Sequence, residues 1–108
     1  MLVILFRSRL TEAADADYVA MDEELEGIAR SAPGFIDLKS YTAQDGERLT
    51  VVRWRDAETL RAWRENARHR EAQRTGRARW YAEYHIEVAE LVRESKFTRE
   101  GAAPPLTR

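Results

Sequence analysis

The chain has 108 residues, with 18 basic and 19 acidic side chains, a formal net charge of −1 and no cysteine. A chain of this length forms one domain and buries enough surface to fold without a disulfide or a metal ion. The lack of cysteine excludes disulfides, thiolate metal sites and a cysteine nucleophile. The near-neutral charge argues against attraction of the whole molecule to nucleic acid or anionic lipid.

The apolar run at residues 1–6 is the one segment that could be taken for a targeting signal. It lacks a preceding basic region and a small-residue cleavage site, and Arg7 ends it. No stretch approaches the roughly 18 apolar residues of a membrane span. We therefore expect a cytoplasmic protein without membrane association, in which residues 2–9 form a strand with apolar side chains on both faces.

An amphipathic helix is predicted after this strand. Apolar side chains recur at steps of three and four residues, at Ala14, Tyr18, Met21, Leu25 and Ile28. Six acidic residues between positions 15 and 26 form the outer face of the helix. The Pro33-Gly34 pair ends the helix, because proline disfavours helical geometry in the residue before it.

Two strands joined by a tight turn are predicted at residues 35–42 and 48–55. The Asp45-Gly46 pair between them is typical of a hairpin turn. In the second strand, the odd-numbered residues from 49 to 53 and the even-numbered residues from 50 to 54 lie on opposite faces. Asp56, which follows directly, is a plausible N-cap for another helix.

The second helix is predicted over residues 57–76, with Gly76 at its end. Its inward stripe includes Leu60 and Trp63, and its direction changes near His69. The seven arginines between positions 61 and 79 lack the exposed aromatic side chains of a nucleic-acid site. We therefore favour ion pairs between elements or subunits, and expect no nucleic-acid binding.

Residues 80–92 are rich in aromatic and β-branched side chains and are predicted to form the last strand. Simple alternation places Tyr84 on one face of this strand, with Tyr81 and His85 on the other. From Ser95 onward the composition turns polar. We therefore expect one domain over residues 1–97 and a flexible C-terminal tail over residues 98–108.

The order β-α-β-β-α-β is that of a ferredoxin-like α+β fold, in which an antiparallel sheet carries both helices on one face. The first strand is apolar on both faces, and the last strand carries several large aromatic side chains. The sheet face away from the helices would therefore expose a larger apolar patch than a monomer usually tolerates. We expect a homodimer that packs sheet against sheet.

The sequence contains no local catalytic signature, such as a glycine-rich phosphate loop, a paired-histidine metal motif or a serine elbow. A site would be assembled in space, in a cavity between the sheet and the helices. Trp63 either lines that cavity or packs in the core, and His69 is either a group that exchanges protons near neutral pH or a solvated surface residue. Asn66 is either a polar residue of the helix surface or a hydrogen-bond partner for a quinone-like oxygen.

Three further residues, His85, Tyr81 and Arg7, are candidates for the pocket or for an interface. His85 could equally be a hydrogen-bonded residue of the sheet or of a dimer contact. Arg7, like Arg53, interrupts an otherwise buried strand. Since a buried charge is costly unless it is paired, we expect both arginines to form ion pairs.

Three segments, in this order, resemble the antibiotic biosynthesis monooxygenase (ABM) family of dimeric α+β barrel proteins: Pro33-Gly34-Phe35, Trp54-Arg55-Asp56 and Asn66-Ala67-Arg68-His69. The resemblance runs from about Met1 to Phe97. It implies a ferredoxin-like homodimer with a hydrophobic pocket in each subunit. Characterised members of the family oxidise polycyclic phenols or hydroquinones with molecular oxygen, and they need no metal, flavin or haem.

The resemblance implies a monooxygenase that acts on a small aromatic phenol or quinol without a cofactor. His69 would accept the phenolic proton, with Trp63 and Asn66 as pocket groups. The haem-degrading branch of the family has a histidine where this chain has Gln73, so haem degradation is disfavoured. The alternative is a non-catalytic dimeric module that binds a hydrophobic small molecule, for example in a stress response.

Overall fold

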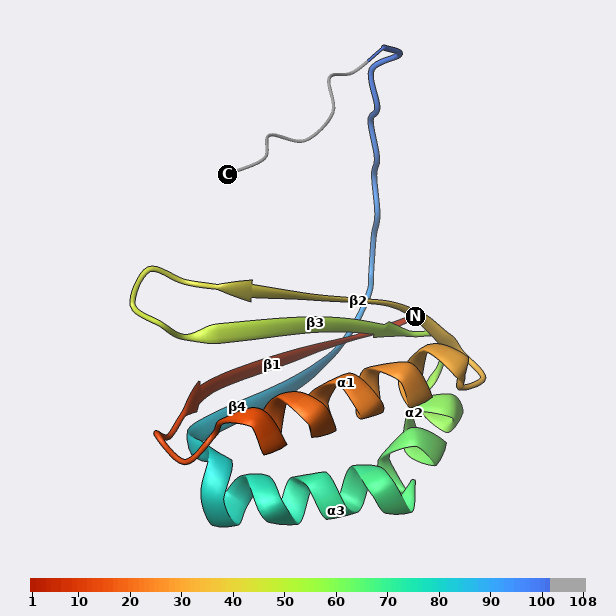
Figure 1. Ribbon diagram of the computed structural model, residues 1–108. Coiled ribbons are helices and arrows are strands. Elements are labelled where there is room, and N and C mark those ends of the chain that lie inside the picture. Colours follow the sequence, from red (N-terminus) through yellow and green to blue (C-terminus); the bar gives the residue numbers. More distant parts are fainter. Residues whose placement is uncertain (102–108) are drawn as a thin grey trace.

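The computed structural model describes residues 1–101 and contains one four-stranded antiparallel sheet with its helices on one face (Figure 1). The strand order is β2-β3-β1-β4. This is the ferredoxin-like α+β fold that the sequence predicts. The elements are β1 (Leu2–Leu10), α1 (Ala16–Ser31), β2 (Phe35–Thr42), β3 (Arg48–Trp54), α2 (Ala57–Arg64), α3 (Ala67–Thr75), the π-helical turn η1 (Gly76–Trp80) and β4 (Tyr81–Glu90).

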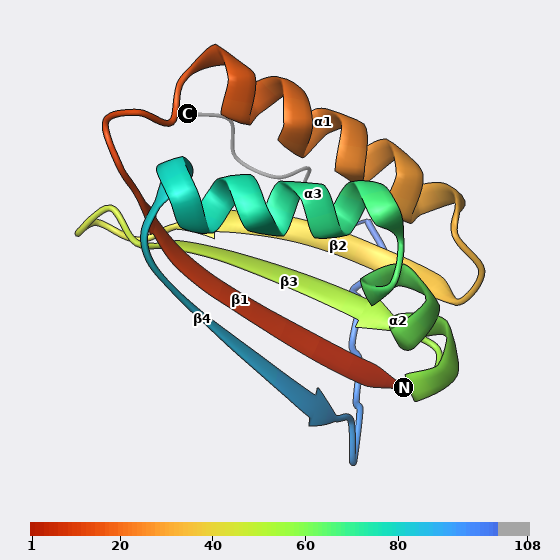
Figure 2. The ribbon, with the colours of Figure 1, turned by 90° about the horizontal axis from the view of Figure 1, so that it is seen from below.

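The sheet is built around β1, which pairs antiparallel with both β3 and β4, while β2 pairs with β3. Even-numbered residues of β1 and β3 face the helices, and Ile4, Trp54 and Leu60 form the buried core cluster. Trp54 is only 1% exposed. The helices cover this one face, so the odd-numbered side chains, such as Leu5 and Val51, lie on the bare face (Figure 2).

The first helix begins two residues later than the start of its predicted apolar stripe. Asp15 is the N-cap, and its side chain accepts a hydrogen bond from the Asp17 N–H at 3.4 Å. Tyr18 and Ala29 are the buried residues of α1. After the helix, Gly34 adopts a φ of +84°, and a side chain there would overlap Thr59 at the start of α2. Gly34 thus permits a close approach between the start of β2 and α2.

The single helix predicted over residues 57–76 is wrong: the structure has two helices, α2 and α3, separated by Glu65 and Asn66. The Asn66 Oδ1 accepts hydrogen bonds from the backbone N–H groups of Arg68 at 2.9 Å and His69 at 3.2 Å. An asparagine that bonds to the backbone in this way starts a new helix and competes with continuation of the old one. The chain also continues past Gly76 through η1 instead of ending its helix there.

The predicted N-cap of α2 is confirmed. Asp56 accepts hydrogen bonds from the Thr59 backbone N–H and hydroxyl group, both at 2.9 Å. These bonds, with the neighbouring Arg55, lower the pKa of Asp56 to about 2. The carboxylate therefore stays ionised at the positive end of the helix.

The last strand differs from its prediction in its length and in the face on which Tyr81 lies. It ends at Glu90, and its pairing with β1 shifts so that Arg9 opposes Glu83 while Leu10 opposes Tyr81. Ala82 is therefore an extra residue in β4. This β-bulge places the Tyr81 side chain on the face opposite to the one that simple alternation predicts. Tyr81 lies on the helix side together with Tyr84, with ring centroids 5.7 Å apart, so the predicted placement on opposite faces is wrong.

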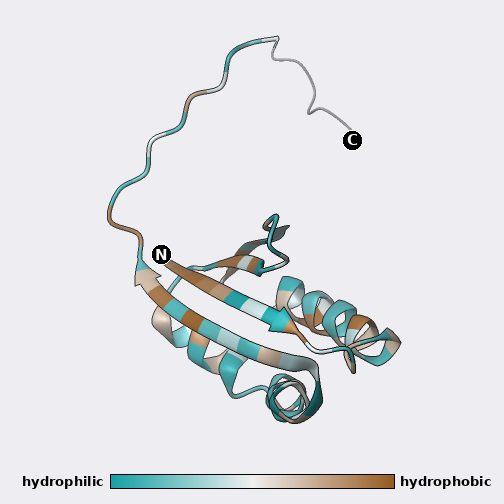
Figure 3. Ribbon diagram, turned by 90° about the vertical axis from the view of Figure 1, so that its left-hand side faces the viewer, coloured by the Kyte–Doolittle hydropathy of each residue, from teal (hydrophilic) through white to brown (hydrophobic). Residues whose placement is uncertain are grey.

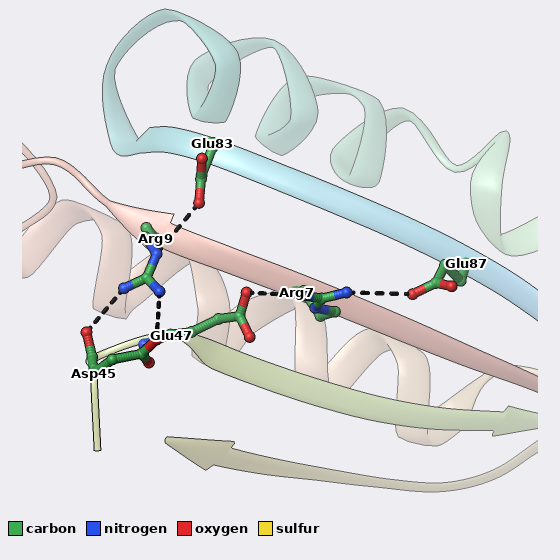
Figure 4. Close-up of polar contacts among 6 residues, drawn as sticks. All are labelled: Arg7, Arg9, Asp45, Glu47, Glu83 and Glu87. Carbon is green, nitrogen blue, oxygen red and sulfur yellow. Dashed lines mark hydrogen bonds and ion pairs between the residues drawn. The ribbon is translucent and has the colours of Figure 1, made fainter. Parts of the chain in front are cut away.

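Ion pairs gather at one end of the bare face (Figure 4). Arg9 contacts Asp45 at 2.8 Å and Glu83 at 3.2 Å. Arg7 contacts Glu47 at 3.4 Å and Glu87 at 3.8 Å.

Arg53 contacts Asp37 at 3.1 Å. The expectation that both Arg7 and Arg53 form ion pairs with acidic residues is therefore confirmed. The same face carries the apolar residues Val3, Leu5, Leu49 and Val51, which are half-buried in the single chain; Leu49 lies opposite Arg7, and Val3 lies opposite Arg53.

Beyond β4 the chain leaves the sheet as an extended segment (Figure 3). Val92 and Phe97 are 93% and 78% exposed there. The predicted tail begins at residue 98, and its residues 102–108 lie outside the described part of the chain. Within residues 1–101, no helix is long and apolar enough to cross a membrane.

Candidate active site

A cavity of about 810 Å³ lies between the sheet and the helices. Its walls are the helix-facing side chains of all four strands and the inner faces of α1, α2 and α3. No helix covers most of β4 (Figure 2), where Tyr84, Ile86 and Val88 remain 39%, 44% and 53% exposed. The cavity is therefore open along β4 and has the size and apolar walls of a small-molecule site.

One end of the cavity is aromatic. The Trp54 ring from β3 stacks on Trp63 from α2, with centroids 6.0 Å apart and an interplanar angle of 26°. Trp63 in turn contacts His69 from α3, with centroids 4.7 Å apart. The structure thus brings two of the predicted site residues, Trp63 and His69, together on the cavity wall.

His69 is the one titratable ring at this aromatic end. Its Nδ1 atom is buried and has no hydrogen-bond partner among the described residues. Burial lowers the pKa of His69; the charge of Arg64 adds to this effect, and the Arg64 backbone opposes it. The imidazole is therefore neutral near pH 7, the form in which a ring nitrogen can accept a proton.

Asn66, the third predicted site residue, is not among the residues that line the cavity. Its Oδ1 caps α3 by accepting from the backbone N–H groups of Arg68 and His69. The amide therefore fixes where α3 begins and, with it, the position of His69 beside Trp63.

The other end of the cavity is polar. Arg48 donates a hydrogen bond from its Nη1 to the hydroxyl of Tyr18, and its guanidinium lies 5.5 Å from the centroid of the Tyr18 ring. Burial raises the pKa of Tyr18 and, more strongly, that of Tyr81. Asp22 lines the same end, and partial desolvation raises the pKa of its carboxyl although the residue stays exposed.

The sequence analysis missed this polar group, although two signals pointed to it. Tyr18 lies on the predicted stripe of the first helix. Arg48 has the same parity as Val52 and Trp54 and therefore shares their face of β3. Tyr81 could not be assigned from alternation, because the bulge at Ala82 has no signature in the sequence.

The remaining two candidates lie away from this cavity. Arg7 and His85 are paired residues of β1 and β4, and they line a separate cavity of about 270 Å³. His85 thus stays a candidate for an interface. Within residues 1–101, no three histidine or acidic side chains are grouped as metal ligands would be.

Comparisons with known proteins place this chain in a family. Residues 1–75 match the family described as antibiotic biosynthesis monooxygenase. The uncharacterized protein YqjZ of Bacillus subtilis is 31% identical over 94 residues, which cover 87% of this chain and 82% of that protein. Jasmonate monooxygenase ABM of Pyricularia oryzae is 28% identical over 93 residues, which cover 84% of this chain but 43% of the fungal protein.

Among solved structures, SnoaB, a cofactor-independent oxygenase from Streptomyces nogalater, matches with a TM-score of 0.72. The match covers 86% of this chain and 94% of SnoaB, and at 13% identity it shows a likeness of fold alone. The family match itself covers more than half of the chain, and YqjZ supports it over most of both sequences. This chain belongs to the antibiotic biosynthesis monooxygenase family.

Proposed function

We propose that this protein is an oxygenase that oxidises a small phenol or quinol with molecular oxygen and needs no metal or organic cofactor. The observation that carries the proposal is His69, whose buried Nδ1 has no partner and whose ring lies against Trp63 on the wall of the 810 Å³ cavity. A lowered pKa keeps this imidazole in the neutral form, which can accept a proton. Two similar proteins, jasmonate monooxygenase ABM and the cofactor-independent oxygenase SnoaB, have names that agree with this reaction class.

The first chemical step is removal of the phenolic proton by His69. The resulting anion is more electron-rich than the phenol and can reduce oxygen directly. For a simple phenol the balance is C₆H₆O + O₂ → C₆H₄O₂ + H₂O, in which one oxygen atom enters the product and the other leaves as water. The substrate supplies all the electrons, so the reaction requires no external reductant.

The aromatic residues hold the substrate ring and keep water away from it. Trp54 and Trp63 provide flat apolar walls beside His69, and aromatic rings pack well against such surfaces. Exclusion of water strengthens the proton transfer and protects the reactive anion. Asn66 acts as a positioning residue, because it fixes the start of the helix that carries His69.

The bare face of the sheet supports a second part of the proposal, a homodimer that packs sheet against sheet. Val3, Leu5, Leu49 and Val51 leave apolar surface on this face in the single chain. Burial of such surface against a second copy is favourable, at about 25 cal/mol for each Å². Arg7, which lies opposite Leu49, would border this contact as a residue already paired with Glu47 and Glu87, so its charge would not enter the contact without a partner.

Oxygen uptake tests the enzymatic proposal. Purified protein, treated with a chelator, is mixed with anthrones and hydroquinones, and the oxygen consumed is compared with the product formed. We expect saturable uptake above the buffer rate, with one oxygen molecule consumed per product. Saturable binding without oxygen uptake would instead favour the non-catalytic ligand-binding module.

A further inference from the structure

Arg48 differs from the ion-paired arginines of the surface. It is partly buried, it lines the large cavity, and its side-chain hydrogen-bond partner is the Tyr18 hydroxyl. Among residues 1–101, no carboxylate lies within 4.0 Å of its guanidinium, whereas Arg9 and Arg68 each contact two. A partly desolvated cation without a close counter-ion favours binding of an anion.

The surroundings of Arg48 hold its guanidinium in one place. Tyr18 both accepts its hydrogen bond and packs its ring against the cation. Tyr18 is itself fixed by edge-to-face contacts with Trp80 at 5.6 Å and Tyr81 at 6.1 Å. Since a guanidinium carries five N–H donors in a planar fork, one bond to Tyr18 leaves donors for a ligand.

We infer that Arg48 forms a subsite that binds a carboxylate of the ligand, while the aromatic ring of the same ligand lies against Trp63 and His69. The inference rests on the proposed function to the extent that both use the same cavity. A planar carboxylate matches the fork of a guanidinium, and charge-assisted hydrogen bonds of this kind are stronger than neutral ones. The subsite thus selects aromatic acids over neutral phenols.

The separation of the two ends sets the shape of the ligand. Arg48 and Trp54 lie on the same face of β3, six residues apart, which corresponds to about 20 Å along the strand. Ile4 and Val52 line the stretch between them. This distance separates backbone positions, and the side chains of Arg48 and Trp63 line the cavity and shorten the span that a ligand must bridge. The ligand is therefore an elongated acid of two or three rings, with a phenol at one end and the carboxylate at the other.

Asp22 allows a second test, because its charge should affect binding of an acid in the opposite direction to the charge of Arg48. Its carboxyl lines the same end of the cavity, and its charge interacts with that of Arg48. A negative charge at this place opposes a bound carboxylate. Removal of the Asp22 charge should therefore strengthen binding of an acid, whereas removal of the Arg48 charge should weaken it.

The experiment compares two probes that differ only in charge: a biphenyl with a hydroxyl at one far end and a carboxylate at the other, and its primary amide. Dissociation constants are measured by calorimetry. The intact protein should bind the acid at least about tenfold more tightly than the amide. Arg48→Gln should remove this preference and leave amide binding within about twofold, which also shows that the cavity is intact.

Two matched variants complete the experiment. Asp22→Asn should tighten acid binding without changing amide binding. Arg53→Gln, which removes an arginine from the opposite face of the same strand, should change neither. Equal affinity of the intact protein for acid and amide, or a preference that survives in Arg48→Gln, would overturn the subsite.

The outcomes separate the subsite from the proposed reaction. Preferential, Arg48-dependent binding of the acid without oxygen uptake by any phenol supports the subsite and contradicts the oxygenase. Equal binding of both probes together with oxygen uptake contradicts only the subsite. Failure of both probes to bind the intact protein overturns the subsite and the use of this cavity for aromatic ligands.

Discussion

The imidazole of His69 lies 4.7 Å from the indole of Trp63, measured between ring centroids, although the two side chains come from different helices. Trp63 is near the end of α2, and His69 is in the first turn of α3. The break at Glu65 and Asn66 turns the chain so that both rings reach the cavity. The helix break is therefore part of the site.

Asn66→Ala should weaken this break. Loss of an N-cap typically lowers the free energy of unfolding by about 0.5–2 kcal/mol, and here it also loosens the first turn of the helix that carries His69. We expect a lower urea midpoint and reduced oxygen uptake. Asn66→Asp, which can accept the same backbone hydrogen bonds, should recover most of the stability. An unchanged midpoint in Asn66→Ala would show that the cap does not stabilise the site.

His69 should make the stability of the protein depend on pH. Its pKa in the folded protein is lowered from the ordinary value of 6.5, mainly by burial, so the unfolded chain binds the proton more readily. The contribution is fully present above the unfolded pKa and is lost as the pH falls below 6.5 toward the lower folded pKa.

Urea unfolding at a pH just above and a pH just below this window measures the effect. His69→Gln removes the titrating ring and should lose less stability than the intact protein over the same interval. Equal losses in the two proteins would mean that His69 titrates alike in the folded and unfolded states. The carboxylates contribute equally to both proteins, so they cancel in the comparison.

Two glycines should respond to alanine in opposite directions. At Gly34, the φ of +84° and the overlap with Thr59 disfavour any side chain, so Gly34→Ala should destabilise by about 1–3 kcal/mol. At Gly27, within α1, an added methyl group meets no atom within 4 Å. Gly27→Ala should stabilise by about 0.5–1 kcal/mol. Thermal unfolding measures both, and equal effects would contradict the close approach at Gly34.

The proposed dimer predicts that a charge on the bare face of the sheet will separate the subunits. Val51→Asp places a carboxylate among the apolar side chains of that face, and we expect sedimentation equilibrium to give the mass of a monomer. Val19→Asp, at a position 52% exposed on α1, should leave the dimer intact. A monomeric intact protein, or a dimeric Val51→Asp, would rule out this packing.

The regular elements of this fold were predictable because their signals are local. The bounds of β2 agree with those predicted between Pro33-Gly34 and the turn at Asp45-Gly46, and the N-cap at Asp56 was also expected. The inward direction of Trp63 followed from its place on the helical stripe. Such features depend on neighbouring residues, which the sequence displays directly.

The features that were missed depend either on a choice between two local roles or on contacts between distant residues. Asn66 was expected as a pocket amide, but its side chain caps the next helix, a choice that local pattern left open. Tyr81 reached the cavity through a bulge whose position is set by pairing with β1. The polar end formed by Arg48 and Tyr18 joins residues 30 positions apart, and only the folded sheet and helix bring them together.

The most direct test of the account is steady-state oxygen uptake by His69→Gln beside the intact protein, measured over a range of pH. The intact protein should show a kcat/KM that rises with pH and levels off once the pH exceeds the lowered pKa of His69. His69→Gln should lose about a hundredfold or more in rate, together with this pH dependence, while it still binds the substrate. Full turnover by His69→Gln, with an unchanged pH profile, would contradict the assignment of His69 as the proton acceptor.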